Sequence, residues 1–145
     1  MTTQFTYPFT AVGGLIIAKD GDILLVCSHK WGMRYTVPGG KVHYGETLIQ
    51  ALYREIAEET ALIVENPRFV QVQESIDSDE FWKKGHFVMH DYLMDLSPKM
   101  GKEDVVLNDE GQSCVWTSPK EAWNFPLNFS AKALISAYQR QKVST

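Results

Sequence analysis

Four glutamates, Glu46, Glu55, Glu58 and Glu59, lie with Arg54 in the short stretch GGKVHYGETLIQALYREIAEETAL. Like charges three or four residues apart on a helix repel each other by about 0.2–0.5 kcal/mol per pair. Another favourable interaction is therefore needed to compensate for the repulsion within this group. Carboxylate oxygens without nearby histidine or thiolate are the ligands that magnesium and manganese prefer. The stretch therefore predicts a divalent-metal site. A solvated acidic face paired with Arg54 is the alternative.

The same stretch predicts a helix that positions these carboxylates. Thr47 begins a capping box, so the helix starts there and runs to about Thr60. At about 100° per residue, Glu55, Glu58 and Glu59 occupy a sector about 100° wide that adjoins the apolar stripe of the helix. Glu59 is thus predicted to be partly buried. A buried carboxylate is unfavourable unless it is protonated, hydrogen-bonded or bound to a cation.

The remaining elements predict an α/β (α+β) fold, an αβα sandwich with a mixed β-sheet. Asp20-Gly21 suits a tight hairpin turn, a short helix is predicted from Ser118, and Ser130 is expected to cap a last helix. Runs of strand formers between turn signals predict strands at 11–18, 22–27, 34–37, 68–75, 86–96 and 113–117.

Length and composition indicate one domain spanning 1–145, with an ordinary 44% apolar and 22% charged residues. The net charge of −4, without a long basic run, argues against nucleic acid as a partner. The N-terminus lacks the features of a signal peptide, and no apolar run approaches the roughly 20 residues that span a bilayer. Cys27 and Cys114 share no metal-ligand spacing and are expected as free thiols. We therefore expect a cytoplasmic protein without a membrane segment.

The acidic stretch resembles the Nudix box of the MutT-like Nudix hydrolases. That pattern is Gly, five residues, Glu, seven residues, Arg-Glu, an aliphatic, any residue, Glu-Glu, any residue, Gly and an aliphatic. The matching positions are Gly40, Glu46, Arg54, Glu55, Ile56, Glu58, Glu59 and Leu62. Ala61 stands where the family has glycine. If that glycine ends the helix with a positive φ, alanine there costs about 1 kcal/mol but removes no ligand.

The resemblance implies a pyrophosphohydrolase dependent on Mg²⁺, with Mn²⁺ as a substitute, in which water attacks the phosphorus of a nucleotide diphosphate linkage. Carried over by position, Glu58 and Glu59 are the main metal ligands, and Glu55 is a third ligand or the base. The carbonyl of Gly39 completes the inner sphere. Arg54 resembles the family arginine that orients these glutamates.

A general base is implied in the loop before the last strand, where Glu110 lies in a stretch that resembles the MutT-type enzymes. Glu110 is therefore our prediction for the catalytic base. Its rivals are Glu55, Glu74, Glu103 and Asp109.

Candidate substrate contacts lie outside the box. Trp31 and Arg34 precede the glycine turn and are placed to meet base and phosphate, with a solvated basic loop as the alternative. Asn128 is placed like the asparagine by which MutT-type enzymes read a purine, although a turn before a capped helix also explains it. We expect a nucleoside triphosphate, such as an oxidised dGTP, or a nucleoside diphosphate derivative. Subgroups acting on ADP-ribose often carry proline or tyrosine beyond the box, and 69–84 contains neither.

The alternative function is a catalytically inactive Nudix-fold domain that senses a nucleotide. Degenerate members generally lose box carboxylates, whereas this chain keeps all four. Many members of the family form homodimers, so a second copy is the protein partner that the resemblance suggests, beside the small nucleotide.

Overall fold

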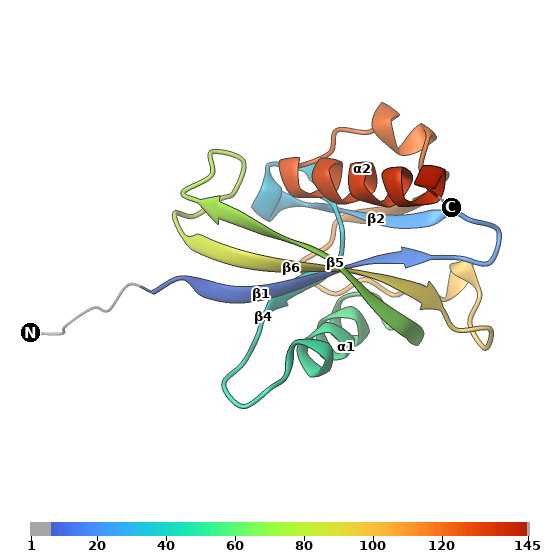
Figure 1. The fold of residues 1–145 in the computed structure, drawn as a ribbon, viewed down its shortest axis with the longest axis horizontal. Coiled ribbons are helices and arrows are strands. Elements are labelled where there is room, and N and C mark those ends of the chain that lie inside the picture. Colours follow the sequence, from blue (N-terminus) through green and yellow to red (C-terminus); the bar gives the residue numbers. More distant parts are fainter. Residues whose placement is uncertain (1–6, 145) are drawn as a thin grey trace, which may run out of the picture.

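A mixed β-sheet lies between two long helices in the computed structural model, which describes residues 7–144 (Figure 1). The strand order is β3-β2-β1-β6-β5, with β4 paired to β1 and β7 to β2. Among the pairs of named strands in residues 7–144, β1–β6 is parallel and the others are antiparallel. The elements are β1 (Phe9–Ile17), β2 (Ile23–Ser28), β3 (Arg34–Thr36), β4 (Gly39–Lys41), α1 (Leu48–Thr60), β5 (Val64–Ile76), β6 (His86–Leu96), β7 (Ser113–Thr117) and α2 (Phe129–Ser144). The predicted αβα sandwich is confirmed.

Residues 1–6 lie outside the described part. They include most of the N-terminal segment that we expect not to be a signal peptide. No helix within 7–144 is long and apolar enough to cross a membrane.

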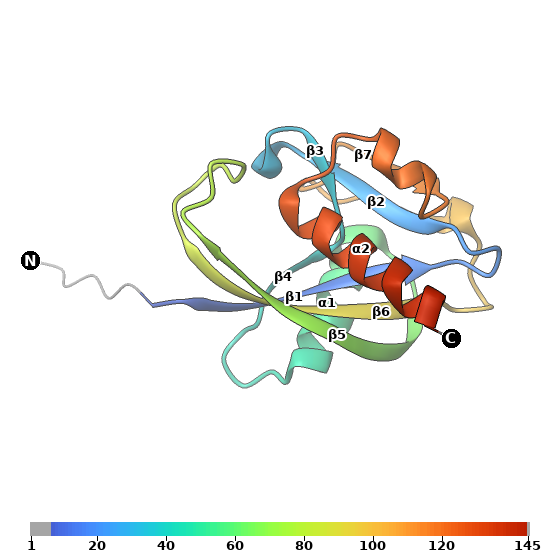
Figure 2. The ribbon, with the colours of Figure 1, turned by 45° about the horizontal axis from the view of Figure 1, so that its top comes forward.

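The sheet divides beyond its first hairpin. At that hairpin Ile17 lies opposite Ile23, and Gly21 has the positive φ of 93° that the predicted Asp20-Gly21 turn requires. Farther from the turn, β1 pairs with β4 and β6, whereas β2 pairs with β3 and β7. Figure 2 shows the β2–β3 side separating from the β1–β6 side. One cleft is lined by residues from both parts of the sheet and from both helices, among them Val26 of β2, Met89 of β6, Glu59 of α1 and Ser130 of α2.

Each face of the sheet buries its own apolar cluster. Successive strand residues point to opposite faces, so Ile16 of β1 packs toward α1 while its neighbour Leu15 packs toward α2. Leu52 and Ile56 of α1 are fully buried in the first cluster. At about 25 cal/mol per Å² of apolar area, each such side chain contributes about 1.5–3 kcal/mol. Packing therefore holds α1, and with it the glutamates, against the sheet.

Both ends of α1 follow local sequence rules. Thr47 caps the helix, and the predicted capping box with Gln50 is present. At the other end Ala61 adopts φ 60° and ψ 14°, and its N–H donates to the Ala57 carbonyl. This is the left-handed conformation expected where the family has glycine, so the alanine is strained there.

Two local predictions in the C-terminal part need correction, one in the start and type of a short helix and the other in the residue that caps α2. The helix expected from Ser118 is a single 3-10 turn at Glu121–Asn124, although the Ser118 hydroxyl does accept from the Glu121 N–H at 3.1 Å. Asn128, and not Ser130, caps α2, because its Oδ1 accepts from the Ala131 N–H at 2.8 Å. Both residue types cap helices. Asn128 is held at the start of α2 by its N–H, which donates to the Tyr35 carbonyl at 3.0 Å.

The strand predicted at 68–75 begins earlier, as β5 at Val64. A shift of pairing register between Glu65 and Arg68 accommodates Pro67, which cannot donate to a regular ladder, and a second shift lies between Phe69 and Gln71.

Candidate active site

Close approach explains the glycine pair in β4. A Cβ on Gly39 would collide with the backbone carbonyl of Val12, and a Cβ on Gly40 would lie 2.6 Å from the carboxylate of Glu55. Neither glycine has a positive φ. Their missing side chains let β4 lie against β1 and against the carboxylates of α1. The N–H of Gly39 donates to Oε2 of Glu59 at 2.7 Å.

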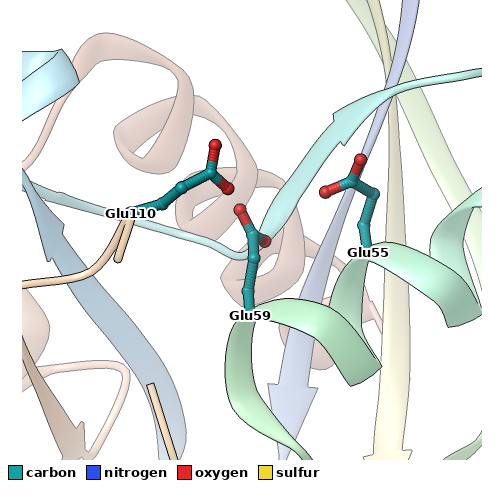
Figure 3. Close-up of side chains that lie close together, drawn as sticks. All are labelled: Glu55, Glu59 and Glu110. Atoms are coloured by element: carbon teal, nitrogen blue, oxygen red, sulfur yellow. The ribbon is translucent and has the colours of Figure 1, made fainter. Parts of the chain in front are cut away.

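Three carboxylates converge beside this strand. Glu55 and Glu59 project from α1, and Glu110 reaches them from the loop before β7 (Figure 3). One oxygen from each lies within 4.8 Å of the others. The structure thus brings Glu110 to the box glutamates, whereas its rivals Glu74, Glu103 and Asp109 are not in this group.

The proximity of these groups perturbs their ionisation. Burial, the hydrogen bond with Glu110 and the charge of Glu55 raise the pKa of Glu59 to about 9. Burial also raises the pKa of Glu55, against the opposing effect of Arg54. Burial acts in the same sense on Glu110, but the hydrogen bonds with Lys30 and Glu59, together with the charge of Lys30, outweigh it and lower the pKa of Glu110. A divalent cation would offset the burial and the neighbouring negative charges that raise the pKa of Glu59, so the donor set fits such an ion.

Arg54 joins the loop before α1 to the carboxylates on it. Its Nε and Nη2 bond both oxygens of Glu46, at 2.6 and 2.8 Å, and its Nη1 donates to Glu55 at 2.9 Å. The guanidinium holds the pKa of Glu46 at about 2. Glu58 lies outside the group of three, with a side chain that is 55% exposed and 3.3 Å from Arg54. Its predicted role as a main metal ligand stays a prediction.

A cleft of about 640 Å³ extends from the carboxylates into the divided sheet. Aromatic rings and basic side chains form a large part of the rest of its wall, including Phe9, Lys30, Trp31, Lys41, Phe81, Trp82, Lys83, Lys84 and Phe87. The predicted contact Trp31 belongs to this wall, and its ring packs 4.6 Å from that of Phe81.

The other two predicted substrate residues are not among the described residues that line the cleft. Arg34 donates to the Trp31 carbonyl at 3.1 Å and so supports the loop that presents that ring. Asn128 is fully buried as the cap of α2.

Sequence reasoning missed Asp91, a buried residue of β6 that lines the cleft. The available signal was its alternation with Met89 and Leu93, which places a carboxylate between two apolar residues on one face of the strand.

Comparisons with known proteins agree with this architecture. The family model of the NUDIX domain matches residues 8–138. The ADP-ribose pyrophosphatase of Methanocaldococcus jannaschii is 33% identical, over 95% of this chain and 77% of its own length. The NAD-capped RNA hydrolase NudC of Pectobacterium atrosepticum is 32% identical over 63% of this chain. The matched segment is only 33% of the length of that protein.

Solved structures share the fold. The MutT NUDIX hydrolase from Burkholderia pseudomallei superposes with a TM-score of 0.74 at 24% identity, covering 90% of this chain and 98% of that one. The NUDIX domain of Shewanella oneidensis NrtR, solved with ADP ribose, gives 0.75 at 18% identity, covering 94% and 90%.

Nudix hydrolases generally use divalent metal ions, and the converging carboxylates on a box helix fit that chemistry. With the family model matching almost the whole described chain, the protein belongs to the Nudix hydrolase family.

Proposed function

We propose that this Nudix hydrolase cleaves the diphosphate linkage of a nucleoside diphosphate derivative with the help of Mg²⁺. The observation that carries the proposal is the meeting of Glu55, Glu59 and Glu110 at one end of a cleft with aromatic and basic walls. Hard carboxylate oxygens suit magnesium, which keeps several waters of its own. When bound, the ion supplies charge for the diphosphate oxygens and lowers the pKa of water.

The chain's own residues have distinct tasks in this proposal. Glu110 accepts the proton of the attacking water, and the ion pair with Lys30 favours its ionised form. Glu55 and Glu59 hold the metal, and Arg54 fixes the direction of Glu55. The Gly39 carbonyl and Glu58, at the edge of the same cleft, remain proposed as further metal ligands.

The proposed substrate class follows from a relative that matches along almost the whole chain. An ADP-ribose pyrophosphatase that is 33% identical over 95% of the chain supports a nucleoside diphosphate linked to a sugar. The lack of proline and tyrosine in 69–84 favoured other substrates, but that short segment weighs less than similarity along the whole domain. Nucleoside triphosphates, including oxidised dGTP, are the second substrate class to test.

The test is metal-dependent product release from ADP-ribose, nucleotide sugars, dinucleoside polyphosphates and deoxynucleoside triphosphates. We expect one class to be cleaved well above the others, with loss of activity in a chelator and in Glu59→Gln. The matched control is Glu103→Gln, an exposed acid outside the group of three, which should retain turnover. Nucleotide binding without cleavage of any substrate would contradict the proposal and favour the sensing domain.

A further inference from the structure

We infer that Asp91 recognises the base of the bound nucleotide, because it can accept a hydrogen bond from an amino group on the edge of that base. This assigns the aromatic part of the cleft to amino-substituted bases. The inference rests on the proposed function only in taking the ligand of the cleft to be a nucleotide.

The first support is the hydrogen bonding of Asp91, which is only 4% exposed. Gln71 and Gln73, from the adjacent strand β5, both donate to Oδ2, at 3.1 and 2.6 Å. No hydrogen bond from the described part of the chain reaches Oδ1. One oxygen of this buried carboxylate is therefore held in place, while the other is available to a donor in the cleft.

The direction of Oδ1 follows from the neighbouring strand. Gly13 of β1 lies directly opposite Asp91, and a Cβ built on Gly13 would be 3.8 Å from Oδ1. Because Gly13 has no side chain, nothing from this residue covers that oxygen. Both residues line the cleft. The free oxygen thus faces the space that a ligand would occupy.

The second support is the position of Asp91 relative to the carboxylate site. Gly39, Gly13 and Asp91 form one row across β4, β1 and β6, and the Gly39 N–H is bonded to Glu59. Two strand spacings place the α-carbons of Gly39 and Asp91 about 10 Å apart. Asp91 points to the α2 face of the sheet and the glutamates stand on α1, but both line the same cleft. A nucleotide that follows this cleft, with its diphosphate at the glutamates, would bring its base to Asp91.

The surroundings of Asp91 suit a flat ring. Met89, two residues earlier on the same face of β6, lines the cleft together with Phe81 and Phe87. The rings of Phe81 and Phe87 lie 5.4 Å apart in an edge-to-face arrangement. Apolar walls with one fixed acceptor are typical of specific ligand pockets, in which the polar group sets the orientation.

Energetics favours a donor at this position. Burial raises the pKa of Asp91, and the two glutamine amides only partly oppose it. A buried carboxylate with an empty acceptor position gains more from a donor than a solvated one does. Hydrogen bonds to charged groups contribute about 1.5–3 kcal/mol, which corresponds to about 10- to 100-fold in affinity.

A purely structural role for Asp91 predicts a different result. Gln73 also donates to the Ser130 carbonyl at 3.0 Å, so the same group of side chains ties β5 to α2. If that were its only role, substitution of Asp91 would change stability while leaving the preference between bases unchanged.

The experiment measures binding of nucleoside monophosphates by calorimetry in a chelator, where hydrolysis is not required. Each pair differs in the amino group alone: AMP with purine riboside monophosphate, GMP with IMP, and CMP with its 4-deamino analogue. The wild type should prefer the amino member of at least one pair by about 10-fold or more. Asp91→Asn should abolish that preference, because its oxygen stays with the glutamine amides and its Nδ2 then faces the cleft.

Asp95→Asn is the matched control, since Asp95 lies on the same strand but pairs with Arg68 outside the cleft, and it should keep the preference. If Asp91→Asn does not fold, the smaller Asp91→Ser makes the same measurement. Equal binding within every pair, failure of all monophosphates to bind, or a preference retained without the carboxylate would overturn the inference. Discrimination without hydrolysis of any substrate would contradict only the proposed function.

Discussion

Glu59→Gln in metal-free protein tests the carboxylate site through stability instead of turnover. Glutamine has the shape of a protonated glutamic acid, so its carbonyl can accept from the Gly39 N–H and its amide can donate to Glu110. Burial, Glu110 and Glu55 raise the pKa of Glu59 from 4.5 to about 9. The folded wild type therefore retains a proton that the unfolded chain releases. The substitution removes this difference between the two states.

The sign and size of the effect follow from proton linkage. Since the folded state binds the proton more tightly, the free energy of unfolding of the wild type falls as pH rises from about 4.5 to about 9. At pH 7.5 the three pKa units above 4.5 correspond to at most about 4 kcal/mol. Solvent in the cleft and the proton shared with Glu110 reduce this value. We expect Glu59→Gln to be more stable than wild type by about 2 kcal/mol at pH 7.5, and equally stable near pH 4.5.

Urea unfolding in a chelator, repeated between pH 4.5 and 9, measures the difference. Glu58→Gln is the matched control, a half-exposed carboxylate next to Glu59, and it should show no such gain. Added magnesium should stabilise the wild type at pH 7.5 and leave Glu59→Gln nearly unchanged. Parallel pH profiles for Glu59→Gln and wild type, or a variant less stable at pH 7.5, would refute the reasoning.

Three further substitutions separate the roles of other residues. Arg54→Lys should lower turnover about 10-fold or more, because an ammonium cannot bond both oxygens of Glu46 and also hold Glu55. Steady-state kinetics measures the turnover, and circular dichroism checks that the variant is folded. Normal turnover would exclude an orienting role for Arg54. Glu110→Gln should reduce kcat by about 10²-fold or more with little change in KM, and an unchanged kcat would transfer the role of base to Glu55. Ala61→Gly should raise the free energy of unfolding by about 0.5–1 kcal/mol without altering turnover, since it relieves the left-handed strain at φ 60°; a lower melting temperature would contradict this.

Interactions between residues close in sequence could be predicted from the amino-acid sequence alone. The capping box at Thr47, the turn at Asp20-Gly21 and the strained end of α1 at Ala61 each depend on a few neighbouring residues. The alternation of strand and helix patterns likewise indicated the layered fold, because each pattern has to bury one face. Glu55, Glu58 and Glu59 could be assigned to one sector of a helix because successive helical residues are about 100° apart.

Tertiary structure decided which of these groups meet. It alone showed that Glu110 approaches Glu59 and that the lack of a side chain on Gly40 makes room for Glu55. It also assigned Asn128 to the cap of α2 and placed Asp91 in the cleft. Local sequence determines which conformation a segment prefers. The pKa values and the shape of the site depend on distances of a few ångströms between strands and loops far apart in the chain, which only the packed fold sets.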